Sequence, residues 1–167
     1  MEIVVNDTNI FIDLHSIGLL DHFFELPIKV HTVDFVINEL TDEEQFNAIS
    51  KFIKNGKLNV QSFEADELLE IIELQSKAGG NVSIPDCAVW NYAKKNRYTL
   101  LTGDGQLRKK AIESNVTVKG IIYIFDHLVE CEIITPQSAV IKLQELLKHN
   151  SRLPKSIIQE RIEKWSE

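Results

Sequence analysis

The chain begins with a short run of apolar residues that gives way abruptly to polar ones. Residues 3–5 are Ile, Val and Val, and Asn6 and Asp7 follow at once. An unbroken apolar run of this length predicts a strand buried on both faces, as in a parallel sheet. Residues 28–33 alternate between apolar and polar as a second strand would, and further short strands are predicted at residues 58–63, 98–102 and 116–118. A sheet of about five short strands is therefore expected.

Between these strands, apolar residues recur at the spacing of helices. Thr41 and Glu44 have the spacing of a capping box, which predicts a helix that begins at residue 41 and ends at Gly56. Other helices are predicted at residues 9–24 as one or two short segments, from 34, at 65–79, at 83–96, from 105, and at 121–128, 136–147 and 154–165. Alternating strands and helices predict an α/β fold, with three layers (α/β/α) around a mainly parallel central sheet. We expect a single domain over residues 1–167, with a helical extension from about residue 126.

Composition is consistent with an ordinary globular domain. Of the 167 residues, 44% are hydrophobic and 26% charged, which is enough apolar material for a core. The N-terminus lacks the pattern of a signal peptide, and no apolar run approaches the length needed to span a bilayer. The isolated Cys87 and Cys131 suggest neither a metal knuckle nor a disulfide framework. These features predict a cytoplasmic protein that does not enter a membrane.

Charge is distributed unevenly along the chain. The formal net charge is −7, which argues against a surface that is basic all over. Residues 34–73 hold ten acids and three lysines, whereas residues 81–120 hold seven basic residues and three acids. The second segment could face phosphates, or both segments could simply form solvated helix faces.

Four acidic residues occupy positions where chemistry is expected. Asp7 and Asp104 follow predicted strands, and ligands of open parallel sheets bind beyond the carboxyl ends of the strands. Asp86 lies on the apolar stripe of its helix, and Glu39 follows a strand through a short helical turn. Asp7, Asp86 and Asp104 could each instead cap a helix. Taken together, the four carboxylates predict a site for a hard divalent cation, Mg²⁺ or Mn²⁺, rather than zinc.

Four short motifs resemble, in order and spacing, the acidic motifs of PIN domains. They are residues 5–9 (VNDTN), 36–40 (VINEL), 84–88 (IPDCA) and 100–104 (LLTGD). The resemblance covers roughly residues 2–125. The continuation at residues 107–111 and 118–121 looks like the PIN branch of VapC-type toxins, and the helical tail to Glu167 fits that branch too.

This resemblance implies a metal-dependent endoribonuclease. By the family pattern, the metal ligands and catalytic residues would be Asp7, Glu39, Asp86 and Asp104, with Asn9 and Thr102 in support. Many relatives carry a further acid where this chain has Gln106, a departure that bears on a second metal ion. The toxin-like branch also implies an antitoxin protein as a partner, and a homodimer is a further hypothesis.

The hypothesised reaction is in-line hydrolysis of an RNA phosphodiester bond. Because carboxylates repel phosphates, basic residues would have to guide a single-stranded or looped RNA; the candidates are Lys94, Arg97, Arg108 and Lys109. The main alternative is a non-catalytic PIN-fold module that binds RNA or a protein. Two other α/β enzyme classes are disfavoured: Asn9 stands where a haloacid-dehalogenase phosphatase would have a second Asp, and the dinucleotide-binding glycine fingerprint is incomplete.

Overall fold

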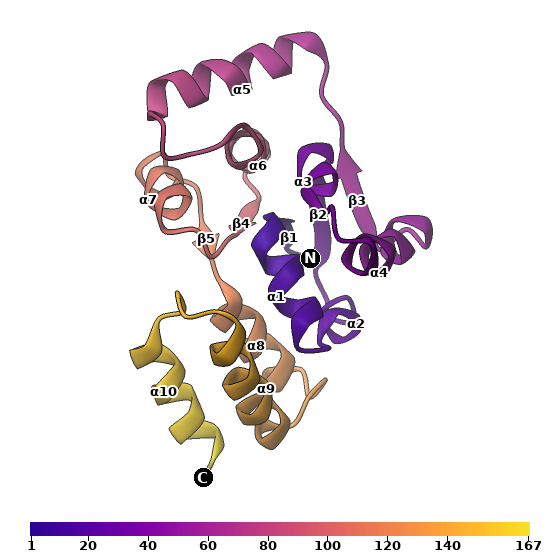
Figure 1. The fold of residues 1–167 in the computed structure, drawn as a ribbon, viewed down its shortest axis with the longest axis vertical. Coiled ribbons are helices and arrows are strands. Elements are labelled where there is room, and N and C mark those ends of the chain that lie inside the picture. The colour runs from indigo at the N-terminus through magenta and orange to yellow at the C-terminus, as the bar shows by residue number, and fades with distance from the viewer.

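A computed structural model describes all 167 residues and contains one five-stranded sheet (Figure 1). The strands are β1 (Ile3–Asn6), β2 (Lys29–Val33), β3 (Leu58–Gln61), β4 (Thr99–Leu101) and β5 (Val118–Lys119). Their order in the sheet is β3-β2-β1-β4-β5, and every neighbouring pair is parallel. The predicted α/β fold with a mainly parallel sheet is confirmed, and the sheet is in fact wholly parallel.

Ten helices connect and extend the strands. They are α1 (Thr8–Ser16), α2 (Leu20–Phe23), α3 (Asp34–Glu39), α4 (Glu43–Lys54), α5 (Ala65–Ala78), α6 (Ile84–Asn96), α7 (Gly105–Glu113), α8 (Ile121–Glu130), α9 (Pro136–His149) and α10 (Lys155–Trp165). None of them is both long and apolar enough to cross a membrane. The predicted start of α4 at Thr41 is wrong by one residue. The N-cap is Asp42, whose carboxylate accepts a hydrogen bond from Gln45 N at 2.9 Å, because Asp caps helices at least as well as Thr.

Strand order determines where ligands can approach the sheet. The chain passes from β1 outward to β2 and β3, and then returns to β4 on the other side of β1. Right-handed connections therefore place α1, α2 and α4 on one face and α6 and α7 on the other, with the strands between them (Figure 1). The order reverses between β1 and β4, so the crevice at their carboxyl ends is the topological switch point.

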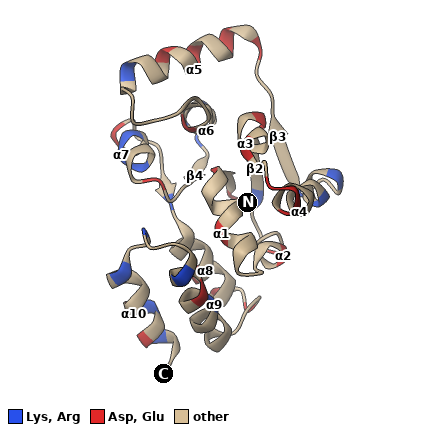
Figure 2. Cartoon of the chain, viewed as in Figure 1, with Lys and Arg blue, Asp and Glu red and all other residues tan.

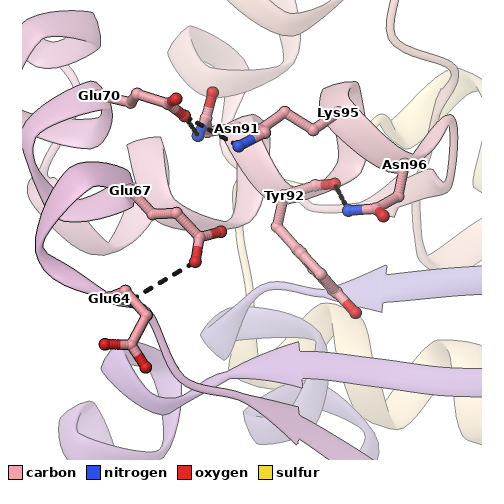
Figure 3. A network of polar contacts seen from close by, with 7 residues as sticks. All are labelled: Glu64, Glu67, Glu70, Asn91, Tyr92, Lys95 and Asn96. Atoms are coloured by element: carbon pink, nitrogen blue, oxygen red, sulfur yellow. Dashed lines mark hydrogen bonds and ion pairs between the residues drawn. The ribbon is translucent and has the colours of Figure 1, made fainter.

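A hydrophobic core holds the central strands in place. Val4 and Val5 of β1 and Leu100 and Leu101 of β4 are fully buried. Outside α6, the long helix α5 packs along it, and Glu70 Oε2 lies 3.0 Å from Lys95 Nζ (Figure 3). The position of α6, which carries Asp86, is thus set from both its sides.

The last three helices pack below the sheet, near α1 and α2 (Figure 1). Helix α8 follows β5 directly and runs through residue 126 without a break. Arg161 of α10 donates two hydrogen bonds, of 2.8 and 3.0 Å, to the carboxylate of Asp126 in α8. The rings of Trp165 in α10 and Phe125 in α8 are stacked. These contacts tie the C-terminal helix to α8.

Candidate metal centre at the carboxyl edge of the sheet

Asp7 lies where β1 ends, at the topological switch point, and its side chain is only 3% exposed. One carboxylate oxygen, Oδ1, accepts a hydrogen bond from Thr8 N at 2.8 Å, which makes Asp7 the N-cap of α1. The other, Oδ2, accepts a hydrogen bond from Thr102 Oγ1 at 2.7 Å. Asp7 therefore caps a helix and also holds a carboxylate inside the crevice between β1 and β4.

Burial of the Asp7 carboxylate makes its charged form unfavourable. Desolvation raises the pKa of Asp7 from its ordinary value of 3.8 to about 7, although the hydrogen bonds from Thr102 and Thr8 act in the opposite direction. The negative charges of Asp86 and Glu39 add to the rise. A buried carboxylate surrounded by like charges needs a cation or a proton.

Thr102 connects Asp7 to the acid that follows β4. Its hydroxyl donates to Asp7 and accepts a hydrogen bond from Asp104 N at 3.1 Å. Asp104 is the N-cap of α7, with Oδ1 2.9 Å from Leu107 N. Asn9 joins the same edge, because its Oδ1 accepts a hydrogen bond from Gly103 N at 3.2 Å. The two predicted supporting residues thus link the loops after β1 and β4.

Glu39 reaches this edge from the end of α3. Its side chain is exposed, and Oε1 accepts a hydrogen bond from Thr8 Oγ1 at 2.7 Å. Thr8 was not among the residues predicted to matter. The only signal in the sequence is its position directly after Asp7, which makes it the first residue of α1 and brings its hydroxyl to the same crevice.

Asp86 lies in the first turn of α6 and is half-buried, as its place on the apolar stripe predicts. It forms a capping box with Ser83: Asp86 Oδ2 accepts from Ser83 N at 2.9 Å, and Ser83 Oγ accepts from Asp86 N at 3.1 Å. Burial raises the pKa of Asp86, and the charge of Asp104 raises it further. The capping alternative therefore describes Asp7, Asp86 and Asp104 correctly, and it coexists with their electrostatic proximity.

The four acids are electrostatic neighbours but do not form a finished coordination sphere. Repulsion connects Asp7 with Asp86 and Glu39, and Asp86 with Asp104. No group of three or more His, Cys, Asp or Glu side chains lies close enough to hold a metal ion as the side chains stand. Glu39, Asp86 and Asp104 nevertheless each keep one carboxylate oxygen without a protein hydrogen bond. An all-oxygen donor set around a buried carboxylate fits Mg²⁺ or Mn²⁺, provided that these three side chains move closer to Asp7.

The structure separates the four basic residues predicted to guide RNA. Arg108 belongs to the second turn of α7, just beyond the cap at Asp104. Its guanidinium lies close to Gly120, because a Cβ added at Gly120 would be 3.9 Å from Arg108 Nη1 and 3.6 Å from Thr102 O. Lys109 is its exposed neighbour. Lys94 and Arg97 instead lie at the far end of α6, about 12 and 16 Å along the helix axis from Asp86. Arg108 therefore lies near the carboxyl edge of the sheet, whereas Lys94 and Arg97 lie away from it.

Similarities to known proteins agree with this architecture. A family model described as PIN domain matches residues 3–167. No curated protein matches the chain. Among solved structures, PAE2754 from Pyrobaculum aerophilum is 16% identical with a TM-score of 0.54 and is matched over 78% of this chain and 98% of that one. A domain of a functionally unknown protein from Methanocaldococcus jannaschii is 16% identical with a TM-score of 0.50, over 72% and 91% of the two chains. At such identities these two similarities concern the fold alone.

A third solved structure is that of VapBC2 from Rickettsia felis bound to a DNA fragment from its promoter. It is 17% identical with a TM-score of 0.49, over 71% of this chain and 98% of that one.

Proposed function

Because the chain belongs to the PIN domain family, we propose that it is a metal-dependent endoribonuclease that hydrolyses RNA phosphodiester bonds at the carboxyl edge of its sheet. The observation that carries this proposal is the buried Asp7 carboxylate, whose pKa is raised by the charges of Asp86 and Glu39 from separate elements, while Asp104 acts in the same way on Asp86. A purely structural aspartate would gain nothing from like charges nearby. A bound cation would neutralise the clustered carboxylates and so account for their arrangement.

In this proposal Asp7, Glu39, Asp86 and Asp104 hold Mg²⁺ or Mn²⁺. The cation would supply positive charge that polarises the attacking water and offsets charge on the phosphodiester oxygens. Thr102 fixes the orientation of the Asp7 carboxylate and ties it to the loop that carries Asp104. Thr8 positions Glu39 through a 2.7 Å hydrogen bond. Arg108 offers guanidinium donors to a neighbouring phosphate group.

A non-catalytic PIN-fold module that binds RNA or a protein is the second candidate. Two observations favour it: no three acids lie within reach of one ion as the side chains stand, and Gln106 replaces an acid common in the family. Where RNA is the ligand, we propose a single-stranded or looped RNA, because a splayed strand fits a cleft that a duplex does not.

Titration with manganese separates the two candidates. For the nuclease, we expect millimolar Mn²⁺ to raise the melting temperature by a few degrees, since an ion that binds only the folded state stabilises it. The same Mn²⁺ should switch on cleavage of a single-stranded RNA, and EDTA should switch it off. The melting temperature and the cleavage rate of the same protein in buffer without divalent ions serve as the reference. A melting temperature that does not respond, together with intact RNA, would favour the non-catalytic module.

Arg108 and Lys94 provide a matched pair of basic residues for testing the path of the RNA. We expect Arg108→Ala to raise KM for RNA about tenfold, because one charge-assisted contact to phosphate is lost. Lys94→Ala removes an exposed base at the other end of α6 and should leave KM within about twofold. Steady-state cleavage kinetics at fixed salt measure both. Equal effects of the two substitutions would mean that the strand does not pass Arg108.

We further propose a protein partner of the antitoxin type, as the toxin-like branch implies, and association with a second copy of the chain. The C-terminal helices present Ile141 and Ile157, which are 55% and 42% exposed, as apolar contact points. A small neighbouring gene that encodes a DNA-binding segment followed by an amphipathic tail would support the first proposal. Light scattering at micromolar concentration tests the second, and a monomeric mass would count against it.

A further inference from the structure

The amino-terminal edge of the sheet carries a polar cluster that the proposed nuclease site does not use. Strands β2 and β3 pair in parallel with His31 opposite Asn59 and Val30 opposite Leu58. Continued by one residue, this register places Lys29 opposite Lys57. Because alternate residues of a strand share a face, Lys29 and His31 of β2 share a face with Asn59 of β3, and Lys57, directly before β3, extends the same alternation.

These four residues line one cavity, in which Lys29, Lys57 and Asn59 are exposed and His31 is half-buried. Its volume is about 380 Å³, and its remaining walls come from residues at the ends of the adjoining segments: Phe24, Ile28, Val30 and Gly56. No acidic residue contributes to the lining. The acid on the neighbouring strand end, Glu2, is turned to other partners, because its carboxylate accepts hydrogen bonds from Thr99 and Tyr123.

Two lysines side by side on neighbouring strands repel each other unless an anion lies between them. Neither Lys29 nor Lys57 takes part in any of the ion pairs of the structure. Figure 2 shows that the C-terminal end of α4 is also basic, but its residues, Lys51 and Lys54, do not line the cavity. The cavity is thus a pocket of uncompensated positive charge in a protein whose net charge is −7.

His31 adds a directed donor to this pocket. Its Nδ1 is 2.8 Å from Tyr92 Oη, and the Tyr92 side chain extends from α6 toward the strands (Figure 3). When the tyrosine hydroxyl donates to Nδ1, the hydrogen of the neutral ring is on Nε2, which has no partner in the protein. The pKa of His31 is lowered by burial and by the charge of Lys29, in keeping with a neutral ring.

We propose that this cavity is a binding site for a phosphate group, held by Lys29, Lys57, His31 and Asn59. Each of the four side chains can donate a hydrogen bond to a phosphate oxygen, and the two ammonium groups supply the opposite charge. The site lies at the amino end of β2, about 13 Å along the strand from its carboxyl end at Val33. It is therefore separate from the acidic crevice and independent of the nuclease proposal.

The phosphate could belong to a free phosphate monoester or to a strand of nucleic acid, and one experiment distinguishes the two. The full-length protein is kept in EDTA, so that no metal-dependent cleavage occurs, and its melting temperature is followed during titration with three probes. The probes are inorganic phosphate, a nucleoside 5′-monophosphate and a single-stranded oligonucleotide, each compared with sodium chloride at equal ionic strength. The variants are Lys29→Gln and Lys57→Gln, with Lys54→Gln as the control, because Lys54 lies at the end of α4 and does not line the cavity.

We expect inorganic phosphate at about 20 mM to raise the melting temperature by about 3 °C or more above the chloride reference. Each pocket variant should weaken phosphate binding at least about tenfold, whereas Lys54→Gln should bind as the wild type does. Similar affinity for phosphate and the monophosphate would assign the site to small phosphate esters, and much tighter binding of the oligonucleotide would assign it to a strand. A response no larger than that to chloride, or one that survives in Lys57→Gln, would overturn the proposal. Broadening of the phosphate ³¹P signal by the wild type and by Lys54→Gln, but not by the two pocket variants, is the second measurement.

Discussion

Replacement of Asp7 with Asn will reduce Mn²⁺-dependent RNA cleavage by at least about 100-fold while the protein stays folded. The substitution keeps the size of the side chain and an oxygen that can accept the hydrogen bond from Thr8 N, so the start of α1 is preserved. It removes the one carboxylate that is both buried and adjacent to the other acids. Initial rates on a single-stranded RNA, measured at saturating Mn²⁺, give the ratio.

Asp42→Asn is the matched control for this experiment. Asp42 is also an N-cap, and its Oδ1 accepts a hydrogen bond from Gln45 N at 2.9 Å, but it lies at the start of α4, outside the acidic crevice. The control should cleave RNA at the wild-type rate. If Asp7→Asn were as active as Asp42→Asn, the metal-dependent mechanism would have to be abandoned, whatever the fate of the phosphate pocket.

The same substitution will change how the stability of the metal-free protein depends on pH. The pKa of Asp7 is about 7 in the folded state, raised by burial from 3.8, so the folded protein binds this proton more tightly than the unfolded chain does. The stability that this proton contributes is complete below pH 3.8 and is lost as the pH rises through 7. Above pH 7 the penalty of the buried charge is on the order of 4 kcal/mol, at about 1.4 kcal/mol for each pKa unit.

Melting temperatures in EDTA between pH 5 and pH 8.5 test this second expectation. Wild type should lose stability relative to Asp7→Asn across this range, so that the variant becomes the more stable protein by several degrees at pH 8.5. Other groups that titrate in this range affect both proteins alike and cancel in the difference. Two curves that run parallel would show that the Asp7 carboxylate is not the buried charge inferred from the structure.

Much of the fold follows from the sequence because local patterns and the overall fold agree. The unbroken run at residues 3–5 becomes the buried strand β1, and the apolar stripe of Val89, Trp90 and Ala93 becomes the buried side of α6. The start of α4 is the exception. Thr41 and Asp42 are both good caps, and only the geometry of the preceding loop decides between them.

The candidate site is less completely predictable. The end of a strand is visible in the sequence, so Asp7 and Asp104 could be placed at the correct edge of the sheet. The contribution of Thr8 to Glu39 is a contact across 31 positions, which no local pattern contains. The excess of basic residues at residues 81–120 predicts that Lys94 and Arg97 guide RNA together with Arg108. A count of charges along the chain does not show that the two ends of α6 lie at opposite edges of the sheet, so that Lys94 is far from Asp86.

Three of the four acids begin helices as well as facing the crevice: Asp7 caps α1, Asp104 caps α7, and Asp86 completes a capping box at the start of α6. The same three side chains would therefore both bind the metal ion and start a helix. Mutational drift that discards the nuclease activity would still have to retain a residue that accepts a hydrogen bond from the helix backbone. Descendants of such a chain that have lost activity should therefore carry Asn or Ser at these positions far more often than Ala or Val.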